Sequence, residues 1–183
     1  MVANHRCVRL RLLMRNAAAT TGWLALGGLR FRCAIGRSGI RAVKREGDGA
    51  TPGGRYRLEQ VLHRAGPGVR PRTGLPIDLI RASDGWCDAV ADRNYNRRVS
   101  HPYLASAERM WRDDGLYDIV VVTSHNHCPR VQGLGSAIFM HVARSGFTPT
   151  EGCIALGKRD LERVLARLPS RATIDMTRVE RPL

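Results

Sequence analysis

The sequence contains very little lysine, few aromatic side chains and no long hydrophobic run. Only two of its 30 basic residues are lysines, Lys44 and Lys158, and aromatic residues make up 5% of the 183 positions. The longest stretch with an apolar bias, Ala17–Gly28, is interrupted by two threonines and a glycine. A helix that spans a bilayer needs about 20 apolar residues, so we expect no transmembrane segment. The shortage of aromatics also leaves few surfaces on which nucleic-acid bases would stack.

Cysteine pairing motifs are also missing. The chain has five cysteines and no Cys-x-x-Cys pattern, which excludes a complete disulfide framework and gives no zinc-ribbon signature. His125, His127 and Cys128 would bind zinc only with a fourth, distant ligand. We expect a polar loop there, with no metal and no cofactor, and keep a zinc protein as an alternative hypothesis.

The composition is otherwise that of an ordinary globular protein, with 43% hydrophobic and 25% charged residues. Its length predicts a single domain over residues 1–183. The net charge of +14 is concentrated at one end, since residues 1–75 hold 15 basic and 3 acidic side chains. A basic half predicts an anionic partner. A nucleic-acid-binding domain is therefore a rival hypothesis, although the arginine bias and the few aromatics weaken it.

Alternating side chains predict a mainly β fold with one clear helix. Apolar residues at helical spacing predict that helix over Lys158–Leu168, ended by Pro169. A further short helix is expected at Ala105–Arg112, and residues 64–102 are expected to be long ordered loops. The predicted strands are Val8–Leu13, a hairpin of Trp23–Leu26 and Leu29–Ile35, Arg55–His63, Tyr117–Thr123, Ser136–Val142, Gly152–Leu156 and Ala172–Val179.

Two of these strands carry a histidine and a cysteine on matching faces. In Ser136–Val142 the period of two separates His141 from the apolar positions, and in Gly152–Leu156 it separates Cys153 from Ile154. If the apolar faces pack on the core, both side chains turn away from it. The glycines and proline between the strands allow the chain to reverse, so the two side chains can meet.

Such a pair is suited to nucleophilic catalysis. An imidazole beside the thiol can hold it as a thiolate ion pair and later protonate a leaving amine. Gly152 leaves room for a substrate carbonyl to approach, and the N–H groups of Gly152 and Cys153 could bind the oxyanion. Spacing alone does not distinguish this arrangement from a histidine and a cysteine that only pack in the core.

Two ordered motifs resemble a known family. His141 followed by Thr150-Glu151-Gly152-Cys153-Ile154, and an upstream segment that begins Thr51-Pro52-Gly53-Gly54, are similar to the active-site pattern of the L,D-transpeptidases, the YkuD-like catalytic domain. The resemblance implies a β-sandwich of mixed sheets with one main helix packed at its end. It also implies that Cys153 is the nucleophile, His141 the base and then the acid, and that Gly152 helps to stabilise the oxyanion. The carbonyl of Val142 would orient the imidazole.

The reaction implied by the resemblance is acyl transfer on peptidoglycan stem peptides, which forms L,D cross-links between two diamino acids or between L-alanine and a diamino acid. Hydrolysis by an L,D-carboxypeptidase or amidase on the same site is an alternative. A periplasmic or envelope location follows, although the sequence shows no clear signal peptide. Three departures mark a divergent branch: Glu151 where histidine is usual, Ala155 where a polar residue is usual, and a short spacing between His141 and Cys153.

Several further residues are candidates for substrate binding. Arg144 follows His141 closely and would meet a substrate carboxylate, whereas Thr150 and Glu151 adjoin the nucleophile. A polar loop adds three candidates for a pocket wall, Asn94, Tyr95 and Arg97. Arg37 and Lys44 are expected to be solvated loop charges, with contact to stem carboxylates as the alternative.

Overall fold

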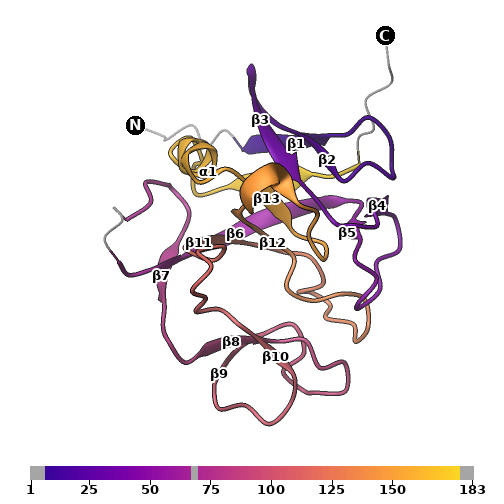
Figure 1. Cartoon of the computed structure of the whole chain (residues 1–183), viewed down its shortest axis with the longest axis vertical. Helices are drawn as coiled ribbons and strands as arrows, with labels where there is room; N and C mark the ends of the chain where they lie inside the picture. Colours follow the sequence, from indigo (N-terminus) through magenta and orange to yellow (C-terminus); the bar gives the residue numbers. More distant parts are fainter. Residues whose placement is uncertain (1–6, 67–69, 178–183) are drawn as a thin grey trace.

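The computed structural model describes residues 7–66 and 70–177, and Figure 1 shows the course of the chain. Strands dominate, as the sequence predicts. They are β1 (Val8–Leu13), β2 (Thr21–Leu26), β3 (Leu29–Ala34), β4 (Ile40–Arg41), β5 (Thr51–Pro52), β6 (Arg55–Arg64), β7 (Ile77–Ile80), β8 (Asp84–Cys87), β9 (Arg98–Ser100), β10 (Ala107–Arg109), β11 (Ile119–Thr123), β12 (Phe139–Val142), β13 (Ile154–Leu156) and β14 (Ala172–Asp175). The helical elements are the 3₁₀ turn η1 (Ser145–Phe147) and the α-helix α1 (Lys158–Leu165).

The main sheet mixes parallel and antiparallel pairs and closes on itself. Its order is β11-β12-β13-β3-β2-β1-β14-β6-β7, and the long strand β6 also pairs with β11. Parallel pairs join β1 to β14, β12 to β13 and β6 to β7. The predicted mixed-sheet architecture with one main helix is confirmed. The two halves of the expected sandwich are continuous, because β6 is long enough to pair with β14 near its start and with β11 further along.

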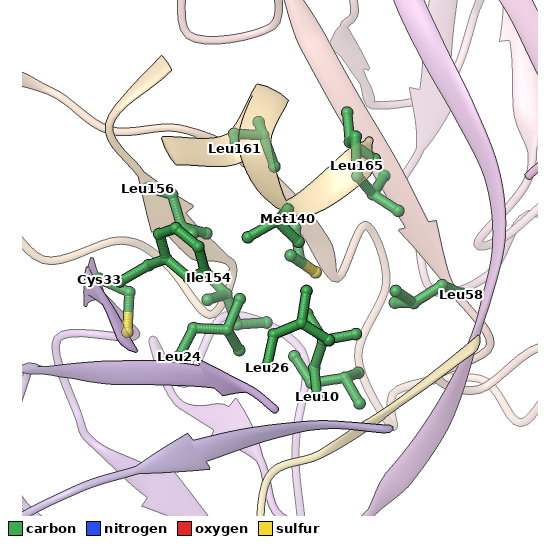
Figure 2. Close-up of a cluster of buried hydrophobic side chains, with 14 of the residues drawn as sticks. Leu10, Leu24, Leu26, Cys33, Leu58, Met140, Ile154, Leu156, Leu161 and Leu165 are labelled. Carbon is green, nitrogen blue, oxygen red and sulfur yellow. The ribbon is translucent and has the colours of Figure 1, made fainter. Parts of the chain in front are cut away.

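The principal core fills the space that this sheet encloses. Figure 2 shows leucines of β1 and β2, Met140 of β12 and Ile154 of β13 converging on side chains of α1. Leu161, Val164 and Leu165 are the buried face of that helix. The helix ends at Leu165, three residues earlier than predicted, but Leu168 in the following turn still packs into the same core. Strands β12 and β13 are therefore held by a tightly packed apolar face.

A second, smaller sheet corrects two predictions. The segment Ala105–Arg112 contains the strand β10 rather than a helix, and it pairs with β8. Residues 64–102 contain β7, β8 and β9 within their loops. The three-stranded sheet β10-β8-β9 lies at the end of the molecule away from α1 (Figure 1). These strands have three or four residues each, so cross-strand pairing forms them where the local sequence shows little alternation.

The second sheet packs on a second apolar cluster. Trp86 of β8, Tyr117, Phe139 and Cys153 belong to this cluster, which lies on the opposite face of β11 and β12 from the principal core. The predicted last strand, Ala172–Val179, ends at Asp175, and the final part of that prediction lies outside the described residues. In the part of the chain that the structure describes, no helix is long and apolar enough to cross a membrane.

Candidate active site

The candidate histidine lies on β12, and the candidate cysteine directly precedes the adjacent parallel strand β13. The register pairs His141 of β12 with Ala155 of β13, and Met140 with Ile154. Cys153 directly precedes β13, so it falls on the same face as Ala155 and one alternate position away from His141. Both side chains are nearly buried, with 6% of His141 and 8% of Cys153 exposed. They line one pocket of about 770 Å³, together with Ala155, the register partner of His141.

Each of the two side chains is held by backbone groups. The Nδ1 atom of His141 lies 2.8 Å from the carbonyl oxygen of Val142. Because a carbonyl oxygen can only accept a hydrogen bond, Nδ1 carries the proton, and Nε2 is unprotonated in the neutral ring. The Cys153 thiol donates to the carbonyl oxygen of Ala137 at 3.1 Å and accepts the N–H of Phe139 at 3.4 Å. The free nitrogen of the imidazole is therefore the one available to accept a proton.

Burial shifts the pKa values of both groups towards the neutral forms. Desolvation raises the pKa of the Cys153 thiol to about 12, with a contribution from the negative charge of Glu108, while Phe139 N–H and Lys44 act in the opposite sense. Desolvation also lowers the pKa of His141 to about 4. These shifts favour a neutral thiol and a neutral imidazole over a thiolate–imidazolium pair. The face of β12 and β13 that was expected to lie outside the core is covered by the second apolar cluster, which removes the water that would stabilise two charges.

The loop that carries Cys153 is bonded to the distant Thr51-Pro52 segment. The Thr51 hydroxyl is completely buried, donates to the carbonyl oxygen of Gly152 at 2.9 Å and accepts the N–H of Gly36 at 2.9 Å. Gly152 has a φ of 140°, and a Cβ placed on it would stand 2.7 Å from the carbonyl oxygen of Ala50. Glycine is therefore required here both by the backbone conformation and by the close approach of the Ala50 carbonyl group.

Thr150 fixes the same loop from within. Its hydroxyl donates to the carbonyl oxygen of Cys153 at 2.7 Å and accepts the N–H of Gly152 at 3.2 Å. The Gly152 amide is thereby engaged in the resting structure. Of the two amides expected to bind an oxyanion, that of Cys153 is the better supported by this geometry.

Lys44 is buried beside the loop that carries Cys153, which corrects the expectation of a solvated charge. Its side chain is 4% exposed, and its Nζ atom lies 2.5 Å from Asp48 Oδ1 and 2.7 Å from the carbonyl oxygen of Arg45. The ion pair and the backbone contact satisfy the buried ammonium group. The lysine lines the pocket, and its positive charge acts to lower the pKa of Cys153.

The opposite wall of the pocket carries a carboxylate that sequence reasoning missed. Glu108 of β10 accepts the Tyr117 hydroxyl at 2.7 Å, and the Tyr117 ring lies edge-on to His141 with centroids 5.3 Å apart. Glu108 lies in the segment that was expected to be helical, so its place beside the pocket follows from the pairing of β10 with β8. No local signal in the sequence distinguishes it from other surface acids.

The predicted substrate-binding residues divide into two groups. Arg144, Thr150 and Glu151 line the pocket. Glu151 is at its rim, 75% exposed and 2.9 Å from Arg37, while Arg144 is 61% exposed. Asn94, Tyr95 and Arg97 are not among the described residues that line the pocket: Tyr95 is buried with its hydroxyl on Glu46 at 2.5 Å, and Asn94 donates to the Tyr103 hydroxyl.

Asn96, which the sequence did not single out, lies next to those three and supports the site. It is 1% exposed and has a φ of 56°. Its Oδ1 accepts the N–H groups of Ala137 and of the Trp86 indole, and its Nδ2 donates to the carbonyl oxygens of His125 and Asn126. By binding the Ala137 N–H, Asn96 helps to position the Ala137 carbonyl, which accepts the hydrogen bond from the Cys153 thiol.

The residues of the alternative zinc hypothesis have other partners. His125 Nε2 lies 2.9 Å from the carbonyl oxygen of Leu134, and His127 Nδ1 lies 2.7 Å from Glu59 Oε2. Cys128 is exposed. Within residues 7–66 and 70–177, no group of three or more histidine, cysteine or acidic side chains is arranged to hold a metal ion.

Comparison with known families agrees with this geometry. The sequence model of YkuD, the L,D-transpeptidase catalytic domain, matches residues 11–179, which is nearly the whole chain. The chain belongs to the L,D-transpeptidase catalytic-domain family. No curated protein sequence matches it significantly. L,D-transpeptidase-type domains act on peptidoglycan and are typically associated with the cell envelope. The family match therefore gives the nucleic-acid alternative no support.

Proposed function

We propose that the protein is a peptidoglycan L,D-transpeptidase that transfers an acyl group from a donor stem peptide, through a thioester on Cys153, to an amine of an acceptor stem. The observation that carries this proposal is the placement of Cys153 and His141 on one face of adjacent strands in one pocket, with the Nδ1 atom of the imidazole held by the Val142 carbonyl. The expected periplasmic or envelope location, where peptidoglycan lies, is part of the proposal.

The resting protonation states define the first step. A neutral thiol is a weak nucleophile, so its proton must leave as the sulfur attacks the amide that follows the diamino acid of the donor. His141 Nε2 accepts that proton, because Nδ1 already carries one. The imidazolium then protonates the leaving D-alanine amine, and a thioester remains on Cys153. The amide N–H of Cys153 supports the oxyanion that develops during the attack.

The second step repeats this chemistry with a new nucleophile. The acceptor amine attacks the thioester carbonyl, His141 receives a proton from it, and the departing sulfur recovers that proton as a thiol. If water attacks instead, the product is a shortened stem peptide, which is the hydrolase alternative. Both reactions use the same residues, so the affinity of the pocket for an amine decides between them.

The identity of the bond formed tests the proposal. Purified sacculi or stem tetrapeptides are incubated with the full chain, and the muropeptides are analysed by mass spectrometry. We expect cross-linked products and D-alanine release from the wild type, and neither from Cys153→Ala. The matched control is Cys128→Ala, which removes an exposed thiol outside the pocket and leaves the products unchanged. A carbapenem adduct on the intact protein, lost in Cys153→Ala, is a second readout. Equal products from wild type and Cys153→Ala would disprove the proposal.

A further inference from the structure

The lining of the pocket has more acidic than basic residues, whereas the protein as a whole is strongly basic. The whole chain carries a net charge of +14, yet four acidic residues line the pocket against three basic ones. The acidic residues are Glu46, Asp88, Glu108 and Glu151, and the basic residues are Lys44, Arg112 and Arg144. A concave surface with an excess of one sign of charge favours ligands of the opposite sign. This local reversal points to a cationic ligand group.

Two of the three basic side chains of the lining form ion pairs with acids outside it. Lys44 pairs with Asp48, and the guanidinium of Arg112 forms two bonds to Asp114, at 3.0 and 2.6 Å. Asp48 and Asp114 are not among the residues that line the pocket. The charges of Lys44 and Arg112 are thus offset by carboxylates outside the lining, as the charge of Glu151 is offset by Arg37. Glu46, Asp88 and Glu108 then face Arg144, which itself lies 3.6 Å from Asp114.

Glu108 is the carboxylate best placed to receive a ligand. Its described contacts, the Tyr117 hydroxyl at 2.7 Å and Arg112 at 3.7 Å, both fall on Oε1. A carboxylate can accept about four hydrogen bonds, so capacity remains for a ligand. Its negative charge acts on the Cys153 thiol, whose pKa it helps to raise. Glu108 therefore lies within electrostatic reach of the reacting sulfur.

Asp88 adds a second carboxylate with an unmet hydrogen bond. Its Oδ1 atom is buried and has no hydrogen-bond partner among the described residues, and the residue lines the same pocket. Its charge acts on Glu108, whose pKa is raised mainly by burial and further by Asp88. A buried acceptor without a partner is energetically unfavourable, and two neighbouring carboxylates repel each other. A bound ammonium group relieves both conditions at once.

We propose that Glu108, together with Asp88, forms the subsite that binds the ammonium group of the acyl acceptor. The assignment of the bound cation to the acyl acceptor rests on the proposed function. The existence of an acidic subsite does not depend on that function. Glu108 lies on β10 and Asp88 directly follows β8, and both line the pocket that also contains Cys153 and His141. It concentrates amines beside the thioester and so favours transfer over attack by water.

Thiol reagents of opposite charge test the subsite without any peptidoglycan substrate. The full chain is treated with a cationic trimethylammonium-ethyl methanethiosulfonate or an anionic sulfonatoethyl methanethiosulfonate, and the rate at Cys153 is followed by peptide mass mapping. Both reagents react with the same thiolate, so a change in the thiolate fraction alters both rates equally and leaves their ratio unchanged. We expect Glu108→Gln to lower the cation-to-anion ratio at least about threefold, as removal of one nearby charge in a partly hydrated pocket predicts. The glutamine can still accept the Tyr117 hydroxyl.

Glu162→Gln is the matched control, because it removes the same charge from an exposed position on α1. It should leave the ratio unchanged. A ratio in Glu108→Gln equal to that of the wild type and of Glu162→Gln would overturn the acidic subsite.

A partition experiment then tests the assignment to the acceptor. Stem tetrapeptide is supplied as donor and stem tripeptide as acceptor, and D-alanine release, cross-linked dimer and hydrolysed peptide are measured. We expect Glu108→Gln to release D-alanine but to lower the ratio of dimer to hydrolysed peptide about tenfold, since a charge-assisted contact to the amine is lost. An unchanged ratio would overturn the assignment. A wild type that releases no D-alanine would refute the proposed function, while the reagent ratio would still decide the acidic subsite.

Discussion

The link between Thr51 and the nucleophile loop gives a prediction whose size follows from the structure. Thr51→Val replaces a fully buried hydroxyl by a methyl group of similar volume. The change removes two hydrogen bonds, one to the carbonyl oxygen of Gly152 and one from the N–H of Gly36, both at 2.9 Å. The two backbone groups then remain buried without a partner.

Each backbone group left unsatisfied by loss of its partner costs about 1–3 kcal/mol. We therefore expect Thr51→Val to lower the free energy of unfolding by about 3 kcal/mol. For a domain of this size each kcal/mol lowers Tm by about 2–4 °C, so Tm should fall by roughly 6–12 °C. Acylation should also slow, because the Gly152 carbonyl helps to hold the loop that presents Cys153.

Urea denaturation of the full chain measures the stability, and intact-mass detection of acylation by a carbapenem measures the reactivity. Thr51→Ser is the matched control, because it keeps the hydroxyl and loses only a methyl group. It should retain most of the stability and the acylation rate. If Thr51→Val and wild type differ by less than about 0.5 kcal/mol, which is the range of ordinary surface substitutions, the two hydrogen bonds do not stabilise the site and the reasoning fails.

Two further predictions concern the glycine and the histidine of the site. Gly152→Ala places a Cβ 2.7 Å from a backbone oxygen at a φ of 140°, so it should destabilise the protein by about 1–3 kcal/mol or more and abolish acylation. The control is Gly28→Ala, where a Cβ meets nothing within 4 Å. Equal unfolding free energies of the two variants would contradict the prediction. The pKa of His141 is lowered to about 4, so the buried form of the ring is the neutral one. The stability that His141 contributes is therefore complete above about pH 6.5 and declines as the pH falls towards 4. The wild type should therefore lose about 3 kcal/mol more than His141→Gln between pH 7 and pH 4, as measured by urea unfolding at both values, and parallel losses would show that His141 is not buried in its neutral form.

Much of the main sheet could be predicted because its strands alternate or are continuously apolar. Val8–Leu13, the hairpin around Gly27 and the run before Thr123 are found as expected. The strands of the small sheet were missed, since β8, β9 and β10 are short and lie among glycine, proline and charged residues. Their stability comes from pairing with one another and from packing against the second apolar cluster, which no local window of sequence contains.

The sequence by itself indicated which residues are the candidate nucleophile and base. Alternation along two strands placed His141 and Cys153 on matching faces, the preceding glycine marked the tight loop, and the order of the two motifs indicated the family. These features depend on the period of the β-strand and on local backbone conformation, so they can be read from neighbouring residues.

Only the tertiary structure decided the protonation states and the electrostatics of the pocket. Desolvation of Cys153 and His141 depends on side chains from the second sheet, which are distant in sequence. The bond from Thr51 to Gly152 spans 101 residues, and the acidic wall arises because strand pairing brings Glu108 and Asp88 to the pocket of a strongly basic protein. A pKa depends on the surroundings of a group in three dimensions, whereas the sequence supplies only the group itself.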